Sequence, residues 1–309
     1  MQVSLIFIAI ILGLPLSLMS QEEMNDPIPF FKTVVYTLSD DSLHGRSPGT
    51  TDELKSLDFI EQKLTSSTKK KLRFHRQSFT IPMAEDSLRN ATNGYFFINN
   101  RAKTTVIISA HYDHIGYGDG KSASFALNQI HNGADDNASG VSMVMALGAH
   151  LFNNRKNAET NFLVVFYSGH ELGLYGSDVF SQMVFAKQRK FKKVVEVINF
   201  DMVGRMDKDL KILKCTSAFD SILANVHATN LGIKMNAGEV KQLGFLDTKP
   251  YFEKGISCLN FSTGVHLDYH KPSDDADYIN FEGMALIYTY LLQILDEFYA
   301  PSLHRNLPD

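Results

Sequence analysis

The chain has 309 residues, 44% of them hydrophobic and 11% aromatic, enough to bury the core of one large domain or two small ones. Its formal net charge of −4 excludes the basic excess that a nucleic-acid-binding surface normally carries, so we expect no nucleic-acid partner. The basic cluster of Lys69, Lys70 and Lys71 with Arg73 and Arg76 is interpreted as a solvated face.

The N-terminus opens with an apolar run over residues 3–18, interrupted by Gly13 and Pro15 and followed by the polar stretch QEEMND. This layout is typical of a secretory signal peptide. We therefore expect residues 1–20 to be removed and residues 21–309 to form a secreted or periplasmic chain. The alternative is an uncleaved membrane anchor, for which the run is short. No later apolar stretch approaches that length, so we expect no stable membrane association after cleavage.

The predicted elements begin with a helix and a Gly/Pro loop over residues 33–50, then a helix over 53–64 whose apolar residues recur at helical spacing. Two extended segments, 72–81 and 93–99, follow. Beyond them, strands predicted at 104–110, 161–168, 194–204 and 258–263 alternate with helices predicted at 138–152, 173–188 and 283–298. This alternation predicts an α/β fold: a single-domain three-layer α/β/α sandwich with a mixed, largely parallel sheet.

Polar side chains lie at the carboxyl end of each of these strands or in the segment before the helix predicted at 138–152. They are His111 and Asp113, Asp135 and Asp136, His170 and Glu171, Asp201, and His266, His270 and Asp274. In such a fold, ligands bind outside the carboxyl ends of the strands. Carboxylates gathered at one edge would repel one another without a cation, so the pattern predicts a metal site.

The residue types narrow the choice of metal. Imidazoles mixed with carboxylates, with no thiolate, indicate zinc or a similar first-row metal rather than calcium or magnesium. The ligands exceed the needs of one zinc and suit a pair of metals sharing a bridging carboxylate. The helical zinc-protease motif requires a second His four residues after His170, where Leu174 stands. A Gly-x-Ser-x-Gly elbow is also absent.

Five motifs, AHYDHIG, GADDNASG, SGHELGLYGS, INFDMVG and DYHKPSDD, resemble in order and spacing those of the M28 family of co-catalytic di-zinc peptidases, over residues 38–297. The resemblance implies two Zn²⁺ ions per chain. The implied metal ligands are His111 and Asp201 for one ion, Glu171 and His270 for the other, and Asp136 as the bridge. It further implies that Asp113 orients the imidazole of His111, and Asp274, four residues after His270, is expected to do the same for that ligand.

The chain departs from the family at His170, where members usually carry the Glu that acts as general base. An imidazole there can accept a proton, add a ligand to the metal, or stand idle in a site without turnover. A second departure is Leu246-Asp247-Thr248, where members often show Ser-Asp-His. Phe245, Tyr251 and Phe252 are candidates for the apolar lining of a side-chain pocket or for core packing.

The resulting hypothesis is a secreted zinc aminopeptidase that acts on the N-termini of peptides or proteins, with His170 and Asp113 as its catalytic residues. One alternative is a catalytically impaired pseudo-peptidase that keeps the metal-binding fold. Another is a transferase similar to glutaminyl cyclases. Whether Cys215 and Cys258, both in strand-like surroundings, form a disulfide also stays open.

Overall fold

The computed structural model describes residues 26–84, 86–118, 120–124, 128–154, 159–206, 209–215, 228–237 and 244–299, with the backbone alone at 209–215, 235–237 and 296–299. The predicted signal peptide lies outside these residues. An eight-stranded mixed sheet has the order β1-β2-β4-β3-β5-β8-β6-β7. The strands are β1 (His75–Pro82), β2 (Leu88–Ile98), β3 (Thr104–His111), β4 (Asn161–Tyr167), β5 (Lys193–Phe200), β6 (Asp209–Cys215), β7 (Lys234–Ala237) and β8 (Ser257–Ser262).

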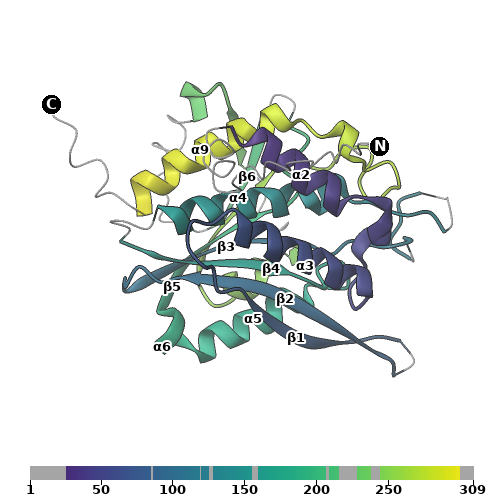
Figure 1. The fold of residues 1–309 in the computed structure, drawn as a ribbon, viewed down its shortest axis with the longest axis horizontal. Coiled ribbons are helices and arrows are strands. Elements are labelled where there is room, and N and C mark those ends of the chain that lie inside the picture. The colour runs from purple at the N-terminus through teal and green to yellow at the C-terminus, as the bar shows by residue number, and fades with distance from the viewer. Residues whose placement is uncertain are drawn as a thin grey trace, which may run out of the picture.

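Helices cover both faces of the sheet. Figure 1 shows α2 (Ile28–Leu38), α4 (Gly140–Asn153) and α9 (Phe281–Tyr299) above it, with α3 (Thr51–Ser66) packed against α4. On the other face lie α5 (Tyr175–Ala186), α6 (Gln188–Phe191) and α8 (Lys249–Phe252). A separate cluster of buried apolar side chains fills each interface. The predicted three-layer sandwich is confirmed. Within the described residues, no helix combines the length and apolarity needed to cross a membrane.

The burial pattern explains the strand sequences. All seven residues of β4 are buried, because this strand lies between two others and is covered by helices on both faces. Its sequence is therefore continuously apolar instead of alternating. Helix α3 begins two residues before the range predicted for it and is capped by Thr50, whose hydroxyl accepts the N–H of Glu53 at 3.2 Å.

The parallel centre of the sheet determines where the loops meet. Strands β4, β3, β5 and β8 are adjacent and parallel, so their carboxyl ends lie along one edge. The last residue of β3, His111, is in register with Tyr167 at the end of β4. Phe200 at the end of β5 is likewise in register with Phe261 in β8. The segments that follow these strands therefore reach the same place.

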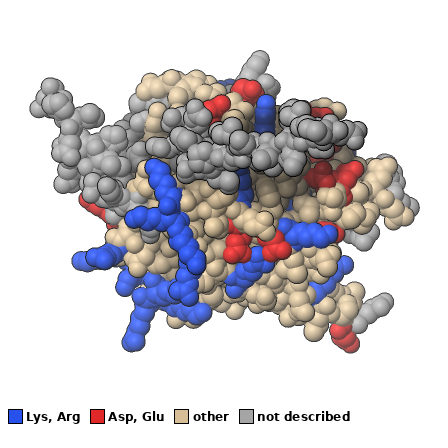
Figure 2. Space-filling model, in the orientation of Figure 1, with Lys and Arg blue, Asp and Glu red and all other residues tan. Residues whose placement is uncertain are grey.

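The surface carries the basic cluster that was predicted and a second one that was not. Arg76, a member of the predicted basic cluster, lies on the surface. Its guanidinium forms ion pairs with Asp58 at 2.7 Å and Glu61 at 2.6 Å. A second basic run was not predicted: Figure 2 shows Lys and Arg gathered where Figure 1 labels α6, and the exposed residues there are Lys187, Arg189, Lys190, Lys192 and Lys193.

The cysteines are brought together by the sheet. In the antiparallel pairing of β6 with β8, Cys215 lies directly opposite Cys258. The side chain of Cys215 is outside the described residues, so whether the two cysteines form a disulfide stays open.

Candidate metal centre

The centre is organised around the carboxylate of Asp136, in the buried turn before α4. One of its oxygens, Oδ1, lies 3.3 Å from Nε2 of His111. The other, Oδ2, lies 3.3 Å from Nε2 of His270. Asp201 is 3.6 Å from the same nitrogen of His111, and Glu171 is 3.3 Å from the same nitrogen of His270. Two pairs of side chains, each a His and a carboxylate, thus flank one shared carboxylate.

These spacings fit a divalent metal. Two atoms that coordinate one tetrahedral zinc at about 2.0–2.1 Å lie about 3.4 Å apart. The contacts around Asp136 span 3.3 to 3.6 Å. Nε2 of His111 and Oε1 of Glu171 are buried and make no hydrogen bond within the described part of the chain. Buried polar atoms that converge without hydrogen bonds are the arrangement expected of metal ligands.

Each ligand imidazole is held through its other nitrogen. Nδ1 of His111 lies 3.2 Å from the backbone oxygen of Asp113, and Nδ1 of His270 lies 3.1 Å from that of Lys121. A carbonyl oxygen only accepts a hydrogen bond, so Nδ1 carries the proton in a neutral ring and the lone pair stays on Nε2. This is the usual support of a metal-binding histidine.

Asp113 acts on the backbone more than on the imidazole. Its buried carboxylate accepts the N–H groups of His170 at 3.3 Å and Glu171 at 3.1 Å, and it lies 3.8 Å from Nδ1 of His111. Burial is the main cause that raises the pKa of Asp113, to about 6. The structure therefore places this residue, predicted as catalytic, behind the turn that carries His170 and Glu171.

Asp274 and Asp135 brace the turn that carries Asp136. The carboxylate of Asp274 accepts the backbone N–H groups of Asp135 and Asp136 at 3.0 Å, so the expectation that it orients His270 is wrong. Asp135 accepts the N–H of Gly204 at 2.6 Å and lies 3.2 Å from Nε2 of His266.

The start of the same turn requires a glycine. Gly133 has a φ of +58°, and a Cβ there would lie 2.2 Å from the backbone oxygen of Asp136. Larger residues are thereby excluded from the position that leads into the shared carboxylate.

Contacts within the centre keep its carboxylates ionised and raise the pKa of its imidazoles. Burial alone would raise the pKa of Asp136, but contacts with His111 and His270 hold it well below its usual range. Burial and Asp136 raise the pKa of Glu171, yet contacts with His114 and His270 outweigh them and lower it. Burial lowers the pKa of His270, but the same two carboxylates raise it to about 10. A divalent cation can replace the protons that these imidazoles would otherwise hold.

His170 lies beside this centre. Its ring stacks on that of His111, with centroids 3.7 Å apart and planes 7° apart. Its Nδ1 is 3.0 Å from Oδ2 of Asp247, whose side chain is fully buried. Burial and His111 lower the pKa of His170, but Asp247 and Asp201 raise it to about 9. Ligand-type atoms of His111, His170 and Asp201 come within 4.8 Å of one another.

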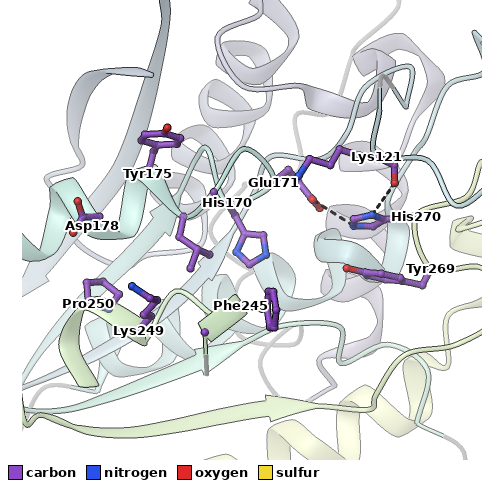
Figure 3. Close-up of a pocket in the computed structure, with 13 residues that line it drawn as sticks. Lys121, His170, Glu171, Tyr175, Asp178, Phe245, Lys249, Pro250, Tyr269 and His270 are labelled. Atoms are coloured by element: carbon purple, nitrogen blue, oxygen red, sulfur yellow. Dashed lines mark hydrogen bonds and ion pairs between the residues drawn. The ribbon is translucent and has the colours of Figure 1, made fainter. Parts of the chain in front are cut away.

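A pocket of about 610 Å³ opens beside the centre. Figure 3 shows His170 projecting into it, with Glu171 and His270 on one side. Apolar parts of its wall come from Leu174, Tyr175, Phe245, Pro250 and Tyr269. Of the three aromatic residues proposed as lining, Phe245 lines the pocket and is 78% exposed. Tyr251 is fully buried in the core and Phe252 packs against it, so for these two the core interpretation is confirmed.

Two residues near the centre were given no role from sequence. His114 is fully buried, with Nδ1 3.3 Å from Oε1 of Glu171, although its place in the AHYDHIG motif was a signal. Arg46, 1% exposed, donates to the backbone oxygens of Tyr112 at 2.9 Å, Asn132 at 2.6 Å and Gly133 at 3.0 Å. It also donates to the backbone oxygen of Leu38. This guanidinium ties together the segments that lead to Asp113 and Asp136, and no feature of the sequence around it predicts that.

Several solved structures share the fold. They include the zinc aminopeptidase BSAP from Bacillus subtilis, 16% identical over 88% of this chain and 95% of that chain with a TM-score of 0.67. The LapA aminopeptidase from Legionella pneumophila is 16% identical over 97% and 80%, with a TM-score of 0.65. A glutaminyl cyclase from Porphyromonas gingivalis is 19% identical over 86% and 98%, with a TM-score of 0.70. At these identities the likeness shows the fold alone.

Sequence comparison identifies the family. No curated protein matches the chain. The model of peptidase family M28 matches residues 96–295, which include every residue that forms the two pairs and the shared carboxylate. This match covers more than half of the chain and contains four strands that end at the centre. The chain therefore belongs to peptidase family M28.

Proposed function

We propose that the chain is an exported zinc-dependent aminopeptidase that removes residues from the N-termini of peptides through a two-metal site. The observation that carries the proposal is the position of Asp136, whose two oxygens each lie 3.3 Å from a different imidazole. A carboxylate shared in this way suits two ions, whereas a single zinc would leave one His and one carboxylate without a role. Export rests on the apolar run over residues 3–18.

Five side chains would hold the metals. His111 and Asp201 would bind one ion, Glu171 and His270 the other, and Asp136 both. Zinc, when bound, supplies Lewis-acid polarisation of a carbonyl oxygen and lowers the pKa of water. Asp113 keeps Glu171 and His170 in place by accepting their N–H groups, and Arg46 fixes the backbone before Asp113 and Asp136.

The pocket supports binding of one end of a peptide. Its volume of about 610 Å³ accommodates one or two residues, and the apolar parts of its wall suit a side chain. Glu171 and Asp178 line the pocket, and a carboxylate there favours a positively charged α-amino group. Tyr269 lines the same pocket and offers a hydroxyl as a hydrogen-bond donor to a substrate carbonyl. His170 projects into the pocket. Two zinc ions bound beside it would oppose the carboxylates that raise its pKa, so that the neutral imidazole accepts the proton of the attacking water.

The test is an assay of residues 21–309, purified and loaded with zinc, on a panel of aminoacyl chromogenic substrates. We expect turnover that is lost in Glu171→Ala. A parent without turnover that is rescued by His170→Glu would instead identify a retired peptidase.

The same preparation should be given a peptide with N-terminal glutamine. Release of ammonia with formation of a pyroglutamyl end, and no aminopeptidase turnover, would replace the proposal by a cyclase. The aminopeptidase, the retired peptidase and the cyclase are thus distinguished by three different results.

A further inference from the structure

We infer that Asp247 is a positioning residue that holds the His170 ring in one orientation and one tautomer, so that the two side chains work as a dyad. This inference rests on the proposed function, because it concerns the residue to which that function assigns proton transfer. The contact is 3.0 Å between Nδ1 of His170 and Oδ2 of Asp247.

Asp247 is a buried carboxylate, so its contact with His170 has to compensate for the water it has lost. The carboxylate is fully buried, and its Oδ1 makes no hydrogen bond within the described part of the chain. A buried carboxylate costs free energy unless a partner compensates for the lost water. The His170 side chain is 14% exposed and faces the pocket. A carboxylate buried beneath a pocket-facing imidazole is the arrangement expected of a group that serves a site.

The contact selects the tautomer. An ionised carboxylate only accepts hydrogen bonds, so Nδ1 of His170 must donate. In the neutral ring the lone pair then lies on Nε2. The Nδ1–H of His170 donates the hydrogen bond that compensates the ionised carboxylate of Asp247 in its buried position. Asp247 thus leaves Nε2 as the only nitrogen that can accept a proton.

The ring is also fixed in space. One face lies against His111, at a centroid distance of 3.7 Å, and the backbone N–H of His170 is held by Asp113 at 3.3 Å. The ring is thus held by its stacking on His111 and by the hydrogen bond of Nδ1 to Asp247, and the backbone that carries it is held by Asp113. Figure 3 shows the ring within the pocket, where a substrate would lie.

The dyad accounts for the protons of hydrolysis. As the water oxygen bonds to the scissile carbonyl carbon, one proton moves from that water to Nε2 of His170, and Asp247 stabilises the imidazolium. When the C–N bond breaks, the same proton passes to the departing amine nitrogen and His170 is neutral again. One water is consumed and two shorter products are released, so the dyad returns to its starting state.

A double-mutant cycle tests the inference. Asp247→Asn should lower kcat by about 10²-fold with little change in KM, because an amide also offers a donor and allows the other tautomer. In the His170→Glu background, Asp247→Asn should leave kcat within about 2-fold, since no imidazole remains to be oriented. A merely structural role of Asp247 would lower kcat equally in both backgrounds and would overturn the inference.

The matched control is Glu196→Gln. Glu196 is a buried carboxylate in β5, 6% exposed, and it accepts a hydrogen bond from Ser257 away from the centre. This variant should keep the parent kcat. An equal loss of kcat in Glu196→Gln and Asp247→Asn would attribute the effect to the removal of any buried charge and would count against the dyad.

A second readout does not depend on turnover. Long-range ¹⁵N NMR of the zinc-loaded protein, with the His170 signals assigned by their loss in His170→Gln, should show the proton on Nδ1. Asp247→Asn should shift the population towards Nε2–H. A parent with the proton on Nε2 would overturn the inference even in an active enzyme. A parent with the proton on Nδ1 but no turnover would refute the proposed function while the positioning role stands.

Discussion

The imidazole rings of His111 and His170 stack in parallel, with centroids 3.7 Å apart and planes 7° apart. An imidazole nitrogen coordinates a metal through a lone pair in the plane of its ring. The lone pairs of two rings at this spacing lie in parallel planes, so they cannot both point at one ion at about 2.1 Å. His170 is thus placed beside the metal ligands and is not itself one.

Replacing each histidine separately tests this relationship. His170→Ala should keep the zinc content and affinity of the parent, because Nε2 of His170 is not a ligand. His111→Ala should lower zinc affinity by about 10²-fold or more, because a ligand is lost. The number of zinc ions per chain, measured by inductively coupled plasma mass spectrometry after dialysis, checks both variants. Equal losses of zinc in the two variants would contradict the account.

Arg46→Ala should destabilise the protein by roughly 3 kcal/mol, because four backbone oxygens lose their donor in a buried position. Arg76→Ala is the control: its ion pairs with Asp58 and Glu61 lie on the surface and contribute less than about 1 kcal/mol. Urea unfolding gives both free energies. A loss as small for Arg46→Ala as for Arg76→Ala would show that the buried guanidinium does not hold these segments.

Most strands, their order along the chain and the side chains that meet at the candidate centre could be predicted from sequence, because each carries a local signal. Continuous apolar runs indicate buried parallel strands, and polar residues at their ends follow the geometry of such sheets. The edge strand β7 was not predicted, since four residues carry too little periodicity.

Contacts between distant segments could not be predicted. The partner of Asp274 proved to be the backbone of Asp135 and Asp136 instead of His270, and the carboxylate of Asp113 lies on the turn at His170. The hydrogen bond of His170 to Asp247 joins residues 77 positions apart. Such contacts depend on loop conformations, which no spacing in the sequence determines.

Phe245→Ala should raise KM for substrates with a large apolar N-terminal residue by about 10-fold and leave stability unchanged, because the side chain lines the pocket and is 78% exposed. Tyr251→Phe provides the contrast. It removes the hydroxyl that contacts Tyr167 at 2.9 Å in the core, so stability should fall by about 1 kcal/mol with KM unchanged. Steady-state kinetics and thermal unfolding distinguish the two. An unchanged KM in Phe245→Ala would exclude this wall from substrate binding.

Zinc removal should lower the thermal stability. Asp136, Glu171 and Asp201 are gathered around two imidazoles, and an ion that binds only the folded chain stabilises it by about 3 kcal/mol at 100-fold excess over its Kd. Dialysis against a chelator should therefore lower Tm by roughly 5 °C or more, reversibly on adding zinc. Magnesium should not restore Tm, because imidazole ligands do not suit it. Recovery with magnesium alone would contradict the predicted zinc site.

The central claim is that Asp136 joins two metals in a working peptidase site. The most direct measurement is the zinc content of the purified chain together with kcat on an aminoacyl substrate, for the parent and for Asp136→Asn. We predict about two zinc ions per chain and measurable turnover in the parent, with zinc lost and turnover reduced by about 10³-fold or more in the variant. A parent that binds no more than one ion, or a variant that keeps both zinc and turnover, would contradict the claim.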